Sequence, residues 1–123
     1  MAGLQSGTPQ PTEIRLHVRS RKLEVAFDDG QRFHLSCEYL RVYSPSAEVR
    51  GHGAGQEVLQ TGKKNVGIIA VEPVGHYAVK LVFDDGHDSG LYSWAHLYDL
   101  GVNHDRYWQD YLNRLAATHG SRE

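Results

Sequence analysis

Two hairpin signals set the main constraint on how this chain folds. The residues Phe-Asp-Asp-Gly occur at 27–30 and again at 83–86, 56 positions later, and each copy follows an apolar run. Asp-Gly pairs accept the positive φ angles of a tight hairpin turn at low energetic cost. The repeat therefore predicts two related antiparallel strand units within one chain of 123 residues.

The first unit is predicted to be a three-stranded antiparallel meander over residues 14–35. Apolar and polar residues alternate over 14–19 and again over 23–27, as they do in half-buried strands. Phe33 and Leu35 continue the alternation beyond the first Asp-Gly turn.

The second unit is predicted to follow the same plan. An apolar run over 66–71 precedes Pro73 and Gly75, which are expected to end that strand. Apolar residues then alternate from Tyr77 to the second Asp-Gly turn, and a short strand is expected to reach Leu91.

Each unit leads into a short segment with helical character. Residues 37–41 follow Ser36 and residues 94–100 follow Ser93, so each serine is predicted to be a helix N-cap. Gly101 is expected to end the second of these helices, because glycine readily adopts the left-handed geometry of a helix C-terminus.

A last helix is predicted over residues 105–118, with Gly120 at its end. Its apolar residues recur at i, i+3, i+4 and i+7, which places them on one face of a helix. That face is expected to pack against the sheet as part of the core. The residues of this face are Trp108, Tyr111, Leu112 and Leu115.

Together these elements predict an α+β fold. Two related antiparallel β units would form a small sheet or a pair of sheets, with short helices and a C-terminal amphipathic helix. The chain length is typical of one domain, which is expected to span residues 13–119. Residues 1–12 are expected to form a disordered N-terminal tail.

Composition argues against several classes of protein. The 13 basic and 15 acidic side chains are interspersed and give a net charge of −2, whereas a nucleic-acid binder needs a basic stripe. No apolar run approaches the roughly 18 residues of a membrane span, and the N-terminus has no secretory pattern. Cys37 is the single cysteine, so no intrachain disulfide forms, and a cytoplasmic location is expected.

Residues 43–66 form a connection too long and too rich in glycine to be an ordinary link between elements. Such segments are usually functional or disordered, and this one is expected at the edge of the sheet beside the first short helix. Its glycines at 51–55 do not match a dinucleotide-binding pattern, because Gln56 stands at the position of the third glycine. The long connection is therefore the main functional candidate.

Motifs for catalysis are poorly represented. Cys37 lies beside Glu38, whose carboxylate disfavours a thiolate, and no Gly-x-Ser-x-Gly motif is present. The pair Asp28-Asp29 is explained by turn chemistry. The run DDGHDS at 84–89 brings together several oxygen ligands and one imidazole, so weak metal binding is an alternative to an exposed polar hairpin.

Four separated segments together resemble one known family. They are YLRVYSPSAEVRGHG, NVGI, VGHYAVKLVFDDGHDSGLYSW and LYDLG, and the resemblance covers residues 13–101. The chain is similar to the small bacterial proteins of the gamma-butyrobetaine hydroxylase-like N-terminal domain family. The bacterial members of this family are largely domains of unknown function.

The resemblance carries an implication about metal. In the carnitine-pathway hydroxylases this kind of domain holds a structural zinc through three cysteines and one histidine. Matching the motifs implies that Ser44, Ser46 and Val49 stand at the cysteine positions and that His87 stands at the histidine position. Neutral hydroxyl groups are poor zinc ligands, so the inherited site is expected to be absent and no cofactor is expected to be required.

The loop would then be fixed by turns and by side-chain hydrogen bonds, to which Ser44-Pro45-Ser46 is suited. An alternative is that iron or zinc binds to His87 and His52 together with Asp85 or Asp88. A relation to iron or iron–sulfur metabolism is also implied, because similar domains are joined to iron–sulfur carrier ATPases.

The resulting interpretation is a non-catalytic accessory or protein-interaction module. The resemblance implies that the catalytic domain of the related hydroxylases is missing, so the chain is not expected to be an enzyme. A metal-binding protein is the main alternative, and a stand-alone enzyme is a third. The partner is expected to be an unidentified protein, and exposed strand edges also make a homodimer an option.

The interaction surface is expected to combine the 41–56 loop with the facing 84–89 turn, because arginine and tyrosine are common interface anchors. Arg41 has an alternative interpretation, in which it only fixes the loop by hydrogen bonding to carbonyl groups. The predicted surface comprises Arg41, Tyr43, Ser44, Ser46, Glu48, His52, Asp85, His87 and Ser89.

Overall fold

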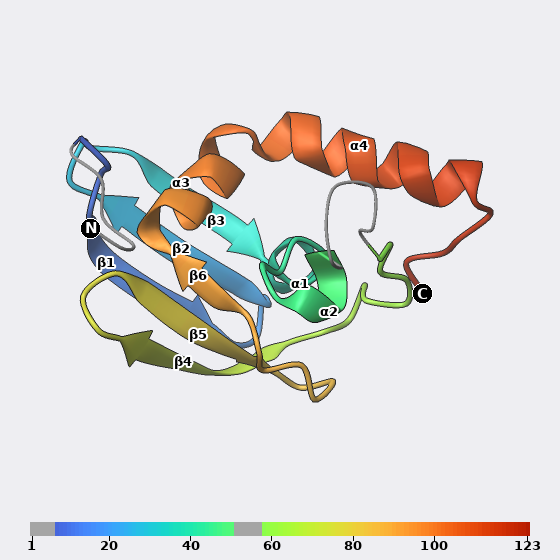
Figure 1. Ribbon diagram of the computed structural model, residues 1–123, viewed down its shortest axis with the longest axis horizontal. Helices are drawn as coiled ribbons and strands as arrows, with labels where there is room; N and C mark the ends of the chain where they lie inside the picture. Colours follow the sequence, from blue (N-terminus) through green and yellow to red (C-terminus); the bar gives the residue numbers. More distant parts are fainter. Residues whose placement is uncertain (1–6, 51–57) are drawn as a thin grey trace.

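The computed structural model describes residues 7–50 and 58–123. Within these ranges the chain forms two three-stranded antiparallel sheets and four helices, so the predicted α+β fold is confirmed. Figure 1 shows the two sheets overlapping in the view, with α3 and α4 above the strands and α1 and α2 at their right-hand end. None of the helices in the described ranges is long and apolar enough to cross a membrane.

The first sheet has the strand order β1-β2-β3, as the predicted meander requires. It comprises β1 (Pro11–His17), β2 (Lys22–Phe27) and β3 (Arg32–Ser36). The strand β1 begins at Pro11, three residues before Ile14, where the predicted alternation starts. Pro11 lies inside the segment predicted to be a disordered tail. Its start is fixed because the Asp28 N–H donates to the Gln10 carbonyl at 2.9 Å. The prediction of disorder up to residue 12 is therefore wrong at its C-terminal end, and residues 1–6 lie outside the described ranges.

The second sheet has the order β4-β5-β6 and comprises β4 (Ile68–Val74), β5 (Ala78–Phe83) and β6 (Leu91–Ser93). Pro73 does not end its strand as predicted, but pairs with Val79 inside β4. This is tolerated because β4 lies at a sheet edge, where the N–H groups of alternate residues point away from the sheet.

The two strand units repeat each other in detail. The Phe27 N–H donates to the Gln31 carbonyl at 2.8 Å, and the Phe83 N–H donates to the His87 carbonyl at 2.9 Å. Each unit also has a register shift near the start of its first strand. The two Phe-Asp-Asp-Gly stretches are therefore equivalent hairpin turns, and Gly30 and Gly86 supply the positive φ angles in them.

The two predicted N-caps are confirmed. Ser36 accepts a hydrogen bond from the Tyr39 N–H at the start of α1 (Cys37–Val42), and Ser93 caps α3 (Trp94–Val102) in the same way. Gly101 does not end α3, because it lies inside the last turn. A Cβ atom at this position would lie 2.4 Å from the Phe33 ring, so the glycine allows the helix and the first sheet to approach closely.

The main core lies between the two sheets and the helices α1 and α3. Its fully buried side chains come from every one of these elements, so the two units share one core. These side chains include Leu23, Val25, Leu35, Leu40, Leu81, Phe83, Tyr92, Leu97 and Leu100.

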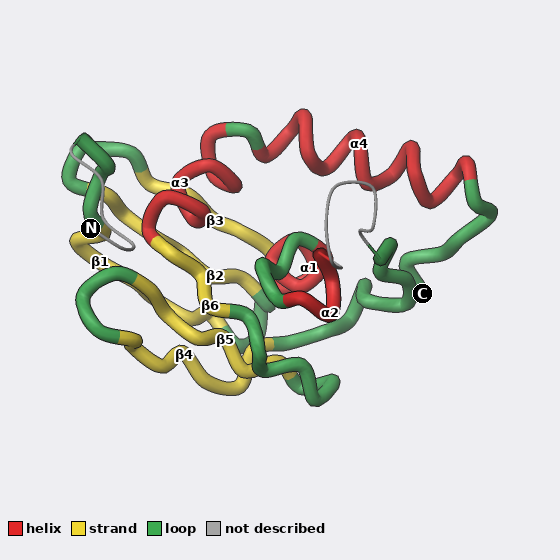
Figure 2. The backbone as a smooth tube through the Cα atoms, viewed as in Figure 1, coloured by secondary structure: helices red, strands yellow, loops and turns green. Residues whose placement is uncertain are grey.

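The long connection after α1 contains the short helix α2 (Ala47–Arg50), and the last helix is α4 (His104–Ala117). The apolar face of α4 does not pack on the sheet as predicted. Tyr111 and Leu115 instead form a second, smaller core with Val42 of α1, and Leu59 packs against it. Figure 2 shows α4 extending above α1 and α2 and away from β4.

The domain extends to the end of the described chain, past the predicted boundary at residue 119. The Gly62 N–H donates to the Ser121 carbonyl and the Lys64 N–H donates to the Arg122 carbonyl, each at 2.9 Å. These strand-like bonds connect residues 120–123 to the segment that precedes β4.

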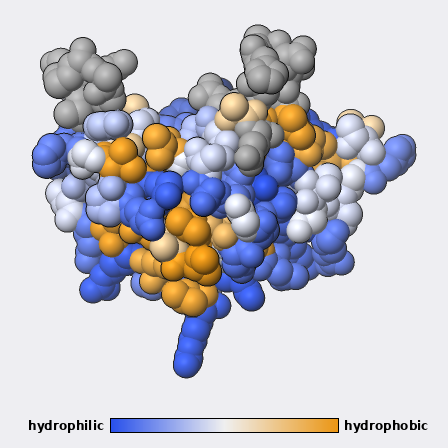
Figure 3. Space-filling model, turned by 60° about the horizontal axis from the view of Figure 1, so that its bottom comes forward, coloured by the Kyte–Doolittle hydropathy of each residue, from blue (hydrophilic) through white to orange (hydrophobic). Residues whose placement is uncertain are grey.

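The molecule also exposes several large apolar side chains around the second sheet. Ile69 and Leu91 are 67% and 47% exposed, and Tyr77 lies near the turn between β4 and β5. Figure 3 shows an apolar area on the side of the molecule that carries β4. Such an area is compatible with the predicted homodimer, which stays a prediction.

Candidate functional site

Four side chains connect the long loop to the second hairpin. Ser44 Oγ and His87 Nε2 are 2.8 Å apart, and the hydroxyl groups of Ser46 and Ser89 are 2.6 Å apart. We refer to these four residues as the serine–histidine network. Ser44, Ser46 and His87 are buried, and Ser89 is exposed. The network therefore fixes the start of the loop to the turn that follows β5.

Local sequence explains why these side chains meet. The helix α1 ends at Val42, and Ser44 Oγ accepts the Ser46 N–H at 3.2 Å in the turn that follows. His87 follows the second Asp-Gly turn and its carbonyl closes the hairpin, which directs the imidazole inward. Gly90 completes the contact, because a Cβ atom there would lie 2.4 Å from Ser44 Oγ.

A charged cluster lies beside the network and centres on Asp85. Arg41 Nε and Lys63 Nζ approach Asp85 Oδ2 to 2.9 and 2.7 Å, and the His87 N–H donates to Oδ1 at 3.1 Å. Burial alone would raise the pKa of Asp85, but the hydrogen bonds from Lys63, from His87 and from Arg41 outweigh it and lower the pKa to about 2. The carboxylate is therefore charged at neutral pH and connects α1 to the second hairpin.

This pKa predicts a pH dependence of stability. A carboxyl group with a lowered pKa in the folded state stabilises the protein above its ordinary pKa of 3.8, and the contribution is lost as pH falls toward 2. We expect Asp85→Asn to lower the free energy of unfolding at pH 7 by about 1 kcal/mol, because solvent screens the interactions of this exposed carboxylate. The difference from the wild type should shrink between pH 4 and pH 2, as measured by urea unfolding. A difference that stays constant over that range would contradict this assignment.

The structure brings most of the predicted surface residues together, but it buries several of them. Arg41, Ser44, Ser46 and His87 are buried, so in this conformation they support the loop from within. Asp85 and Ser89 are exposed, and Tyr43 is half-buried. His52 and the Glu48 side chain lie outside the described part of the structure. The Arg41 guanidinium pairs with the Asp85 carboxylate, and its Nη1 atom is buried without a hydrogen-bond partner in the described part of the chain.

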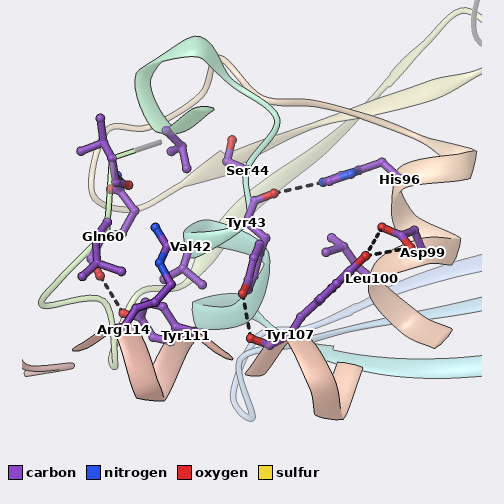
Figure 4. A pocket seen from close by; sticks show the side chains of 13 residues that line it. Val42, Tyr43, Ser44, Gln60, His96, Asp99, Leu100, Tyr107, Tyr111 and Arg114 are labelled. Atoms are coloured by element: carbon purple, nitrogen blue, oxygen red, sulfur yellow. Dashed lines mark hydrogen bonds between the residues drawn. The ribbon is translucent and has the colours of Figure 1, made fainter. Parts of the chain in front are cut away.

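A pocket with a volume of about 290 Å³ opens next to the network. It lies between the end of α1, the helices α3 and α4, and residues 58–60, as Figure 4 shows. We refer to it as the tyrosine pocket. It is lined by Val42, Tyr43, Ser44, Val49, Val58, Leu59, Gln60, His96, Asp99, Leu100, Tyr107, Tyr111 and Arg114.

The tyrosine side chains are fixed walls of this pocket. The hydroxyl groups of Tyr43 and Tyr111 donate to the carbonyl groups of Tyr107 and Gln60, each at 2.7 Å (Figure 4). Burial raises the pKa of Tyr43, and it raises the pKa of Tyr111 to about 12. Both hydroxyl groups therefore stay protonated at neutral pH and keep their rings in place.

Arg114 supplies a cation to the pocket. Its side chain rises from α4 beside Gln60 and Tyr111, as Figure 4 shows. Within the described ranges no ion pair and no hydrogen bond engages its guanidinium group. No local sequence pattern indicates this role, because Arg114 becomes a pocket residue only when the loop, α3 and α4 come together.

The Ser44–His87 pair has the separation of a serine nucleophile and its base. Its surroundings do not suit that chemistry. Ser44 is 1% exposed, its Oγ already accepts the Ser46 N–H, and it lies directly against Gly90 and Tyr92, so little of its hydroxyl group is open to the pocket that Ser44 helps to line. The pair is therefore best explained as a structural hydrogen bond.

The described residues do not fit the zinc site that the family resemblance implies. Two of the four corresponding positions carry neutral hydroxyl groups, at Ser44 and Ser46, and Val49 is apolar and buried. Nowhere in residues 7–50 and 58–123 do three His, Cys, Asp or Glu side chains gather in a way that could hold a metal ion. The proposed metal ligand His52 lies outside these ranges.

Comparison with known proteins identifies the class. Two three-stranded units, each followed by a helix and joined by a long connection that is fixed to the second hairpin, define a small α+β domain. The family model described as gamma-butyrobetaine hydroxylase-like, N-terminal, matches residues 14–98. The chain belongs to this family. A search of curated proteins finds no match.

Three solved structures are similar to this chain. An NMR solution structure of a protein is 62% identical with a TM-score of 0.83, covering 98% of this chain and 89% of that one. A second NMR structure is 50% identical with a TM-score of 0.83, covering 95% and 92%. The third is a crystal structure of a DUF971-family protein of unknown function from Acidithiobacillus ferrooxidans, 42% identical with a TM-score of 0.64, covering 75% and 92%.

Proposed function

We propose that this chain is a non-catalytic accessory module that binds a protein partner in the cytoplasm. The contact surface is centred on the tyrosine pocket. The observation that carries this proposal is the combination of an open pocket with fixed aromatic walls and an arginine that has no partner within the described ranges.

Several features support a binding role. Buried tyrosine and arginine side chains supply most of the energy at many protein interfaces, and here both types line one cavity. Tyr43 and Ser44, which belong to the surface expected from the sequence, also line the pocket. The serine–histidine network holds this part of the loop in place, which reduces the entropy that binding would cost.

The proposal is tested by filling the pocket without disturbing the core. Val58 lines the pocket and is 51% exposed, so Val58→Trp should block the pocket with little effect on stability. Val102 is 55% exposed and does not line this pocket, so Val102→Trp is a matched control. Tagged wild type and both variants are purified from native cells in mild salt, and co-purifying proteins are quantified by mass spectrometry.

We expect one protein to co-purify stoichiometrically with the wild type and with Val102→Trp, and to be lost from Val58→Trp. Equal recovery with all three chains would contradict the pocket as the contact surface. If the partner is a second copy of this chain, sedimentation equilibrium will show a dimer that Val58→Trp dissociates.

The alternative function is metal binding linked to iron or iron–sulfur metabolism. The observation that favours it is the buried His87 imidazole at the junction of the loop and the hairpin. In this alternative His87 and His52 bind iron or zinc, with a carboxylate such as Asp85. Metal analysis of the purified protein separates the two functions, because only the alternative requires a bound metal.

A further inference from the structure

We propose that the tyrosine pocket recognises the C-terminal carboxylate of the partner chain, together with an apolar last side chain. This inference rests on the proposed function, because it names the chemistry of the same pocket. It follows from three properties of the pocket, which are the position of its cation, the character of its walls and the placement of its acidic group.

Arg114 is the cation of the pocket. Arg114 reaches into the pocket between Gln60 and Tyr111 and lies at the opposite side from Asp99 in Figure 4. A guanidinium group presents a planar fork of N–H donors that matches the two oxygen atoms of a carboxylate. Asp110 lies one helical turn away on α4 but is exposed, and no ion pair joins it to Arg114 in the described ranges. Among the residues that the structure describes, the guanidinium therefore has no competing anion.

Apolar walls stand beside this cation. The side chains of Val42, Val49 and Leu59 line the pocket, and the Tyr43 ring forms one of its walls (Figure 4). A C-terminal residue carries its carboxylate and its side chain on the same Cα atom, so a leucine-sized group could occupy the apolar part while the carboxylate meets Arg114. An aspartate or glutamate inside a chain carries its carboxylate at the end of its own side chain, so no separate apolar side chain shares its Cα atom. The walls therefore favour a chain terminus.

The acidic group of the pocket sets the orientation. Asp99 accepts hydrogen bonds from the Tyr107 hydroxyl and from Asn103 Nδ2, and it lies at the α3 side of the pocket. His96 donates from Nε2 to the Tyr43 carbonyl at 3.0 Å on the same side. An anion is disfavoured beside Asp99, so the carboxylate should lie at the Arg114 end. Capture of a terminal carboxylate in a preformed site is a known mode of peptide recognition.

The test uses short peptides as probes of the intact chain. Acetyl-Ala-Ala-Ala-Leu with a free C-terminal carboxylate is titrated into the ¹⁵N-labelled protein, and backbone chemical shifts of Tyr43, Val49 and Leu59 are followed by NMR. The same peptide with a C-terminal amide lacks the charge but keeps the shape. Hexanoate provides a free small acid. Arg114→Gln removes the proposed anchor, and Arg106→Gln is the control because Arg106 lies on the same helix outside the pocket.

We expect the free-acid peptide to bind at least about tenfold more tightly than its amide, and Arg114→Gln to weaken its binding by about tenfold or more. Arg106→Gln should bind as the wild type does. Three results would overturn the assignment. They are equal binding of the acid and the amide peptide, a preference for the acid peptide that Arg114→Gln leaves unchanged, and no chemical-shift change at any pocket residue. Tighter binding of hexanoate than of the peptide would show that the ligand is a small acid and would overturn the assignment to a chain terminus.

The two proposals fail in distinguishable ways. If Val58→Trp releases the native partner while acid and amide peptides bind equally, the pocket remains the contact surface and the carboxylate assignment is wrong. If the acid peptide binds through Arg114 but Val58→Trp leaves partner recovery unchanged, the carboxylate assignment holds and the proposed function is wrong.

Discussion

Gly90→Ala is expected to lower the free energy of unfolding by about 2–4 kcal/mol. A Cβ atom at this position would lie 2.4 Å from Ser44 Oγ and 3.1 Å from the Tyr92 ring. The backbone at Gly90 does not have a positive φ angle, so the effect is steric and not conformational. To relieve the contact the Ser44 hydroxyl must move away from His87, which breaks the serine–histidine network.

A double-mutant cycle with Ser44→Ala tests this mechanism. Removing the hydroxyl group creates space for the new methyl group, so Gly90→Ala should cost less in the Ser44→Ala background than in the wild type. Urea unfolding followed by circular dichroism measures all four proteins. An equal cost of Gly90→Ala in both backgrounds, or a cost below about 0.5 kcal/mol in the wild type, would show that this contact is not tight.

Arg122→Ala is expected to have a comparable effect, a loss of about 2–4 kcal/mol. Arg122 donates from Nε and Nη2 to the two carboxylate oxygens of Glu38 at 2.9 and 2.8 Å. The Glu38 carboxylate is 6% exposed, so removing the arginine leaves a buried charge without its partner. The guanidinium also lies over the Trp108 ring, 5.3 Å from its centroid, and this contact is lost as well.

The control for this prediction is the neighbouring exposed ion pair of the same C-terminal segment. Lys64 and Glu123 are 2.9 Å apart with 42% and 73% of their side chains exposed, so Lys64→Ala should cost less than about 1 kcal/mol. Thermal or chemical unfolding compares the two variants. If both cost the same, burial of Glu38 is not the source of the stabilisation.

The parts of the fold that could be predicted from sequence are those fixed by local chemistry. Strand alternation and the two Asp-Gly turns defined both hairpins, and Ser36 and Ser93 marked both helix starts. The wrong predictions depend on distant neighbours. Gly101 continues its helix because Phe33 packs against it, and Pro73 remains in a strand because that strand lies at an edge. Neither the Phe33 contact nor the edge position of β4 can be predicted from the local sequence pattern.

The candidate site also has parts that the sequence predicts and parts that depend on contacts between distant residues. The proximity of Ser44 and Ser46 to His87 followed from family motifs, which carry information about contacts between distant segments. The tyrosine pocket could not be predicted, because Arg114 and Leu59 become neighbours only after α4 packs on α1. The pairing of Glu38 with Arg122 joins residues 84 positions apart and has no local signal.

We propose that side-chain hydrogen bonds, without a metal ion, hold the loop on the second hairpin and so shape the pocket. Elemental analysis of the protein purified without chelators tests this most directly, with His87→Ala measured in parallel. We predict far less than one zinc or iron per chain, and an unfolding midpoint that a chelator does not change. One equivalent of metal in the wild type, lost from His87→Ala and accompanied by a lower midpoint in chelator, would contradict the claim.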